Sequence, residues 1–203
     1  MASIYDLKPK FQALLRPFSN WLAKHGVTPN QVTIAALIMS MFAGIALAYN
    51  PTSKWPLLLM PFILLFRMIL NAIDGMIAKE HQQKSSLGIF LNEIGDVLSD
   101  TFLYLPFALI PGISPLLIIA IVILAIISEM TGVVAFQIDN KRHYEGPMGK
   151  SDRAFIFGLI ALLLGLNLNI EYWVNIIFII VNLLLLMTIV NRIIKTKLFY
   201  GQS

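Results

Sequence analysis

The sequence of 203 residues contains no cysteine, and charged residues make up only 13% of it. Without cysteine the chain has neither disulfide bonds nor a thiol nucleophile. Soluble domains carry about 25% charged residues, so the scarcity of charge excludes that class. Hydrophobic residues instead make up 58% of the chain, and the mean hydropathy is +0.78. We therefore expect an all-α integral membrane protein.

The formal net charge is +4. A basic protein can bind nucleic acid through a polar face on which its Lys and Arg side chains gather. In this chain the basic residues are scattered between apolar stretches. We therefore expect contact with membrane lipid and no nucleic-acid partner.

Six apolar stretches are long enough to cross about 30 Å of hydrocarbon, which takes about 20 helical residues. Segments rich in Pro, Gly and Asn separate them. The expected transmembrane helices are residues 29–49, 55–79, 87–110, 115–137, 152–169 and 172–194. Lys54 is the only basic residue between spans on one side, and Arg67 lies within a span. All other Lys and Arg lie on the opposite side, so the positive-inside rule places both termini in the cytoplasm.

Apolar side chains recur at helical spacing in residues 4–22, beside Lys8 and Arg16. We interpret residues 1–27 as a cytoplasmic interfacial helix, amphipathic and lying on the inner leaflet. A helix packed against the bundle is the alternative, because the same pattern serves both.

Acidic side chains stand in very apolar surroundings within residues 71–100: Asp74, Glu93, Asp96 and Asp100. This segment is the end of the second expected span and the start of the third, which face the same water. One face of the second span carries Asn71, Asp74, Gly75 and Ala78 at helical spacing. A stripe along the third span repeats every four residues and carries Gly88, Asn92, Asp96 and Asp100. We expect the two faces to converge.

An ionised carboxylate in hydrocarbon costs several kcal/mol unless it is paired, hydrated or bound to metal. Two neighbouring carboxylates therefore need a cation, and hard oxygen ligands suit Mg²⁺ or Mn²⁺. The small residues on the same faces leave room for a bulky group such as a phosphate. The alternative is a structural role, in which these side chains hold the helices together through hydrogen bonds and ion pairs, for example with Arg67.

The segment resembles the signature of the CDP-alcohol phosphotransferase (CDP-alcohol phosphatidyltransferase) family, D-x2-D-G-x2-A-R, eight residues, then G-x3-D-x3-D. The spacing matches throughout, and the family has six spans, so the resemblance covers nearly the whole chain and makes residues 28–203 the transmembrane domain. More narrowly, the chain looks like the YnbA-like bacterial branch. The signature positions are occupied by Asn71, Asp74, Gly75, Ala78, Lys79, Gly88, Asn92 and Asp96.

Three of these positions depart from the signature, because Asn71 and Asn92 replace Asp and Lys79 replaces Arg. Each Asn keeps an oxygen ligand but loses a negative charge, which Glu93 or Asp100 could restore. Lys79 keeps a charge for phosphate but lacks the bidentate fork of Arg. An enzyme with one metal ion, an altered two-metal site and an inactive relative that binds CDP-lipid all remain open.

The resemblance implies transfer of a phosphatidyl group from a CDP-linked donor, such as CDP-diacylglycerol, to an acceptor hydroxyl, with release of CMP. It implies one or two Mg²⁺ or Mn²⁺ ions, a homodimer and a bacterial inner membrane location with a cytoplasmic active site. Asp96 would be the catalytic base. The implied metal ligands are Asn71, Asp74, Asn92 and Asp96. The implied donor-binding residues are Asn30, Thr33, Gly75, Ala78, Lys79, Ser85 and Gly88.

The segment 146–154 opens the fifth expected span with Lys150 and Arg153. Helix N-terminal amides and two cations make an anion site, and by resemblance they would hold the phosphate of a polyol-phosphate acceptor. The alternative is an anchor at the lipid headgroups. Glu129 is an isolated acid within the fourth span, either protonated or paired, for example with Arg67.

Two further alternatives remain. Thr28 and Pro29 are an ordinary helix start, so the neighbouring Asn30 and Thr33 have either a structural or a nucleotide-binding role. The acids could also form the site of a small divalent-metal transporter. Against this, they cluster towards one end of the spans, and the chain shows no paired broken helices in two matching halves.

Overall fold

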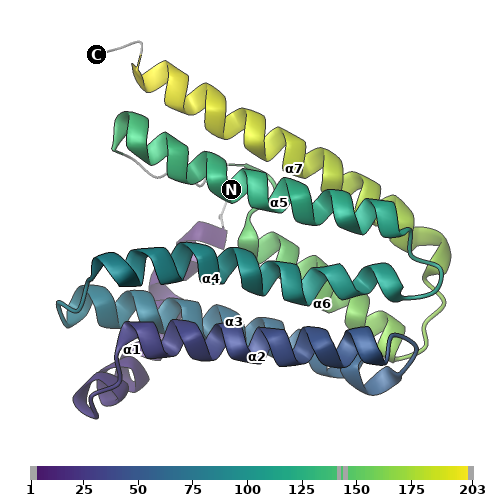
Figure 1. Ribbon diagram of the computed structural model, residues 1–203, viewed down its shortest axis with the longest axis horizontal. Coiled ribbons are helices and arrows are strands. Elements are labelled where there is room, and N and C mark those ends of the chain that lie inside the picture. The colour runs from purple at the N-terminus through teal and green to yellow at the C-terminus, as the bar shows by residue number, and fades with distance from the viewer. Residues whose placement is uncertain (1–3, 141–142, 144–145, 201–203) are drawn as a thin grey trace.

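The computed structural model describes residues 4–140, 143 and 146–200. Within these ranges the chain is helical and has no strand. In chain order the helices are α1 (Ile4–Lys24), α2 (Pro29–Tyr49), α3 (Lys54–Glu80), α4 (Ser86–Tyr104), the 3-10 helix η1 (Leu105–Leu109), α5 (Pro115–Asp139), α6 (Lys150–Gly165) and α7 (Glu171–Tyr200) (Figure 1).

A helix occupies each of the six expected spans. Four of the described helices, α2, α3, α5 and α7, are long and apolar enough to cross a membrane. The other two are of a different kind, because α4 contains Glu93, Asp96 and Asp100 and α6 has only 16 residues. The third expected span also ends early, since the chain turns into η1 at Leu105, just before Pro106. The all-α membrane class is therefore confirmed, whereas the six-span count stays a prediction.

The packing of the helices in pairs fixes the positions of α4 and α6. α2 packs against α3 and α4, α3 against α6, and α5 against α7, and Figure 1 shows α5 and α7 side by side across the top of the bundle. An aromatic cluster joins α4, η1, α6 and α7 at the core. The ring of Phe157 stacks on Tyr104 at 4.2 Å between centroids and meets Phe107 edge-on at 4.9 Å. Such pairs add to the apolar area that they bury.

The N-terminal helix α1 packs along the end of α3. Leu15 and Leu22 lie against the buried side chains of Ile73 and Ile77, and Arg16 pairs with Glu80 at 3.2 Å. Other apolar side chains of α1 remain exposed: Leu14, Phe18 and Trp21. Contact with the bundle, given above as the alternative, is therefore present, and the interfacial placement of α1 stays a prediction.

Contacts between side chains connect four helices near the end of α3. Thr33 of α2 bonds Asp74 of α3, Asn71 of α3 bonds Asp96 of α4, and Lys150 at the start of α6 contacts Asp96. The polar faces of the second and third expected spans thus converge as expected.

Candidate functional site

Asp74 lies at the contact between α2 and α3, and its side chain is buried. The hydroxyl of Thr33 donates a hydrogen bond of 2.7 Å to its Oδ2. Among the described residues Asp74 forms no ion pair, so its charge is stabilised mainly by one hydroxyl.

Asp96 on α4 has a very different environment. The amide nitrogen of Asn71 donates a 2.7 Å hydrogen bond to its Oδ1. Arg67 donates to its backbone carbonyl at 3.0 Å and lies 3.4 Å from the same Oδ1. The ammonium of Lys150 contacts Oδ2. Two cations and an amide therefore surround this carboxylate.

Asp96 is one end of a line of alternating charges that we call the ion-pair chain: Asp96, Arg67, Asp100, Arg153 and Glu129. Arg67 pairs with Asp100 at 2.6 Å, Asp100 with Arg153 at 2.7 Å, and Arg153 with Glu129 at 3.2 Å. The side chains of Arg67 and Arg153 are 1% and 0% exposed. Because removal of one partner strands a buried charge, such a chain tolerates the loss of a member poorly.

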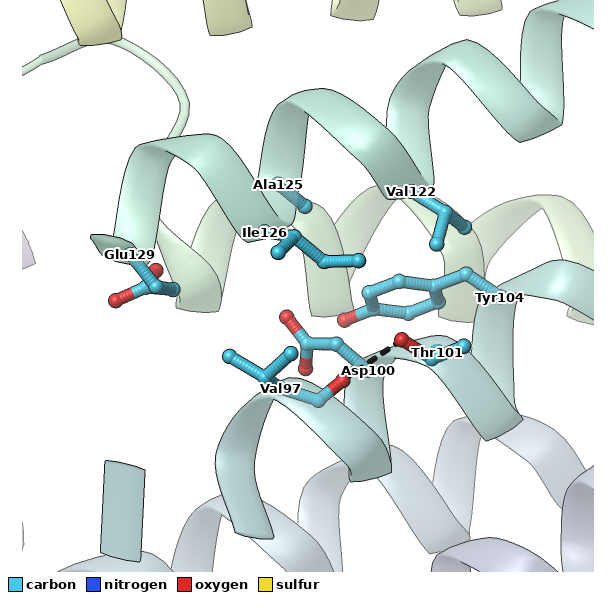
Figure 2. Close-up of a pocket in the computed structure, with 8 residues that line it drawn as sticks. All are labelled: Val97, Asp100, Thr101, Tyr104, Val122, Ala125, Ile126 and Glu129. Carbon is cyan, nitrogen blue, oxygen red and sulfur yellow. Dashed lines mark hydrogen bonds between the residues drawn. The ribbon is translucent and has the colours of Figure 1, made fainter. Parts of the chain in front are cut away.

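The far end of the ion-pair chain lies between α4 and α5. Figure 2 shows Asp100 and Tyr104 of α4 and Glu129 of α5 around a small pocket whose other walls are mostly apolar. Of the two alternatives for Glu129, the structure shows it paired, with Arg153 instead of Arg67. Asp100, expected as an auxiliary acid, is engaged by two arginines. Glu93, the other auxiliary acid, is half-buried on α4.

A second group, which we call the donor face, gathers the residues implied for nucleotide binding around Asp74: Asn30, Thr33, Asp74, Ser85 and Gly88. A Cβ added at Gly88 would lie 2.8 Å from Oδ1 of Asn30 and 3.0 Å from Oγ of Ser85, so these three residues are in contact. A Cβ at Gly75, the residue after Asp74, would meet nothing within 4 Å, so the helix surface at Gly75 is open. Ala78 is half-buried one turn further along α3, and Lys79 is exposed.

Some of these residues also begin helices. Ser85 accepts the amide hydrogen of Gly88 at 3.0 Å and so caps α4. Thr28 and Gln31 form a capping box at the start of α2, with bonds of 2.9 and 3.3 Å. The structural interpretation of Thr28 is therefore confirmed, while Asn30 and Thr33 are turned towards Gly88 and Asp74.

Lys150 and Arg153, the two residues expected to bind the acceptor, lie in different surroundings. Lys150 is the first residue of α6 and is partly exposed beside Asp96. Arg153, one turn later, is fully buried against Asp100 and Glu129. Sequence reasoning did not find these ion pairs. The available signal was the presence of arginines at two positions in apolar helices, since a buried guanidinium needs an acid.

The donor set can be compared with what a divalent cation requires. Within the described ranges no three His, Cys, Asp or Glu side chains come together as a metal-binding group. Mg²⁺ is commonly held by one or two carboxylates together with waters and substrate phosphates. The carboxylate of Asp74 and the amide oxygen of Asn71, whose nitrogen faces Asp96, fit one such ion. Asn92 lies one turn before Asp96 on α4, half-buried.

Comparison with known proteins agrees with the signature. The family model of CDP-alcohol phosphatidyltransferases matches residues 26–192. The chain is 45% identical to the inner membrane protein YnbA of Escherichia coli over 192 residues, 94% of each chain. It is 30% identical to the archaetidylinositol phosphate synthase of Pyrococcus horikoshii over 103 residues, 51% of this chain and 52% of that protein.

Proposed function

Because the chain belongs to the CDP-alcohol phosphatidyltransferase family, we propose that it transfers a phosphatidyl or other phospho-alcohol group from a CDP-linked donor such as CDP-diacylglycerol. The acceptor is an alcohol, CMP is released, and the reaction belongs to phospholipid synthesis. The observation that carries the proposal is that Asn71, one turn before Asp74 on α3, donates a 2.7 Å hydrogen bond to Asp96 on α4, so the two halves of the signature meet, with the donor face alongside.

The donor face is suited to a nucleotide pyrophosphate. The start of α4 at Ser85 and Gly88 lies against Asn30, and the amides of a helix N-terminus favour phosphate oxygens. Gly75, the residue after Asp74, has open space at its Cβ position. Lys79 and Ala78 lie near it on α3, and the exposed ammonium of Lys79 supplies positive charge. Asn30 and Thr33 orient the group from α2.

The proposed metal ligands are Asn71, Asp74, Asn92 and Asp96. A bound Mg²⁺ or Mn²⁺ would neutralise the pyrophosphate and stabilise the leaving CMP. Asp96 then accepts the proton of the attacking hydroxyl. Arg67 keeps the carboxylate of Asp96 in place, because Arg67 bonds both the side chain and the backbone of Asp96. Lys150 is the member of the proposed acceptor pair that lies near enough to the surface to meet an acceptor phosphate, because Arg153 is buried against Asp100 and Glu129.

The proposed membrane arrangement is supported by the same family assignment. Spanning helices and the similarity to an inner membrane protein support a multi-pass protein of a bacterial inner membrane. We propose that α4 and α6, packed against spanning helices, complete six spans, with α1 on the inner leaflet and both termini and the site in the cytoplasm. A homodimer is part of the proposal, and light scattering of the detergent-solubilised protein tests it.

The experiment that tests the reaction measures CMP release by the purified protein in detergent. The protein receives CDP-diacylglycerol, Mg²⁺ or Mn²⁺, and a pool of polyols and polyol phosphates. We expect release that requires the metal ion and is lost in Asp96→Asn. Glu80→Gln is the matched control, because it removes an acid at the end of α3 that faces Arg16 instead of the site.

Two results would contradict the proposal. Binding of CDP-diacylglycerol without release from any acceptor would indicate an inactive relative. Neither release nor binding, together with uptake of Mn²⁺ into proteoliposomes, would indicate a metal transporter.

A further inference from the structure

The signature positions of this chain carry less negative charge than the family signature, which has Asp at four of them. Of its eight positions only Asp74 and Asp96 are acidic, because Asn71 and Asn92 are neutral. The number of cations that the site can hold therefore depends on what already neutralises these two carboxylates.

The charge of Asp96 is neutralised from within the protein. Lys150 contacts Oδ2, and Arg67 lies 3.4 Å from Oδ1. Arg67 is itself held by Asp100 at 2.6 Å, so its guanidinium has a fixed position. Lys150 is anchored as the first residue of α6, which packs against α3. Asp96 thus already has the positive charge beside it that a metal ion would supply.

The charge of Asp74 is not neutralised in this way. Thr33 donates one hydrogen bond of 2.7 Å, and no cation of the described residues forms an ion pair with Asp74. The next residue, Gly75, has open space at its Cβ position. The amide oxygen of Asn71, one turn earlier on α3, is left for a ligand because the amide nitrogen bonds Asp96.

We infer that the site binds a single divalent cation, at Asp74, and that the ammonium of Lys150 on Asp96 supplies the second positive charge. Lys150 is then a built-in cation beside the phosphates of the substrate. A neutral amide at Asn71 and Asn92 is compatible with one ion, because two adjacent divalent ions in a low-dielectric site repel each other strongly without more carboxylates. This inference rests on the proposed function, since it concerns the charge that faces the CDP group.

The test counts bound Mn²⁺ on the full-length protein in detergent, from the electron paramagnetic resonance signal of free Mn²⁺, with and without CDP. We expect one Mn²⁺ per chain for the natural protein and for Lys150→Arg. In Lys150→Gln we expect a second Mn²⁺, or binding of the first that is about tenfold tighter or more, because Asp96 loses its nearest charge. Lys84→Gln is the matched control, since Lys84 is an exposed lysine in the loop between α3 and α4.

Two Mn²⁺ ions or none on the natural protein would overturn the inference, as would identical binding by Lys150→Gln and Lys84→Gln. Counting metal is independent of turnover. Release of CMP by a protein that carries two Mn²⁺ ions would overturn the inference and leave the proposed function intact. One Mn²⁺ per chain without CMP release would overturn the proposed function and leave the inference intact.

Discussion

The donor face and the ion-pair chain meet at Asp96 and Asn71, yet their carboxylates have different kinds of partner. In the ion-pair chain every carboxylate meets a guanidinium, and Arg67 and Arg153 are completely buried. In the donor face Asp74 meets a hydroxyl, with open space at Gly75. Both regions contain acids in apolar surroundings, so the presence of an acid does not by itself distinguish structure from chemistry.

The difference lies in the partners. A carboxylate that is neutralised by fixed cations contributes to the cohesion of the helices and attracts a further cation less strongly. A carboxylate that is only hydrogen-bonded retains charge for a cation from solution. Asp96 stands at the junction of the two regions, because it belongs to the signature and also ends the ion-pair chain.

The largest effect is expected when the ion-pair chain is broken at Arg153. Arg153→Met removes the guanidinium that Asp100 and Glu129 share, and we expect a loss of about 3–5 kcal/mol in folding stability because two buried acids lose a partner. Thermal unfolding in detergent measures it. Arg153→Met combined with Glu129→Gln should recover part of the loss. A melting temperature equal to that of the natural protein would show that the ion-pair chain does not stabilise the fold.

The donor face should respond in activity instead of stability. Asp74→Asn keeps an acceptor for Thr33 but removes the charge, so we expect CMP release to fall at least about a hundredfold, since a metal ion contributes several kcal/mol to such a reaction. The melting temperature should stay nearly constant. Loss of folding in Asp74→Asn, with the surviving protein fully active, would make Asp74 a structural acid like those of the ion-pair chain.

A smaller effect is expected at Gly88. In Gly88→Ala the new Cβ would lie 2.8 Å from Oδ1 of Asn30, so Asn30 must move, and we expect KM for the CDP donor to rise about three- to tenfold while kcat changes less. The same substitution in an Asn30→Ala background should have little further effect. An equal rise in both backgrounds would mean that Asn30 does not transmit it.

The smallest effect is expected at Arg16, whose pair with Glu80 is exposed. The two side chains are 50% and 34% accessible, so Arg16→Gln should change the stability by less than about 0.5 kcal/mol. Thermal unfolding at low and high salt provides the measurement and a baseline for Arg153. A loss as large as that of Arg153→Met would remove the distinction between exposed and buried pairs.

Much of the fold was predictable, because an apolar stretch followed by a turn segment predicts each of the helices α2 to α7. The third expected span was too long, since Pro106 lacks an amide hydrogen and the α-helix gives way to η1. The shared faces of α3 and α4 were also predictable, because helical spacing alone aligns Asn71 with Asp74 and Asn92 with Asp96.

The pairing of charges was not predictable to the same degree. Apolar context shows that Arg67 and Arg153 need acids, but several acids lie within one or two turns of one another. Which one each guanidinium meets depends on how α3, α4, α5 and α6 are rotated about their axes. That rotation is set by packing, for example by Phe157 between Tyr104 and Phe107, and leaves no mark in the local sequence.

The modest apolar character of α4 and α6 bears on how the protein is made. A single acid or arginine at the centre of a helix costs about 2.5–3.5 kcal/mol when that helix enters a bilayer alone. α4 carries Asp96 and Asp100 and α6 carries Arg153, which are ion-paired in the folded bundle. On a six-span arrangement neither helix is a good substrate for stepwise insertion, and the two become stable in the bilayer only once their charges have met. On that arrangement we expect α4 and α6 to be retained in the bilayer by α3 and α2, the spanning helices against which they pack.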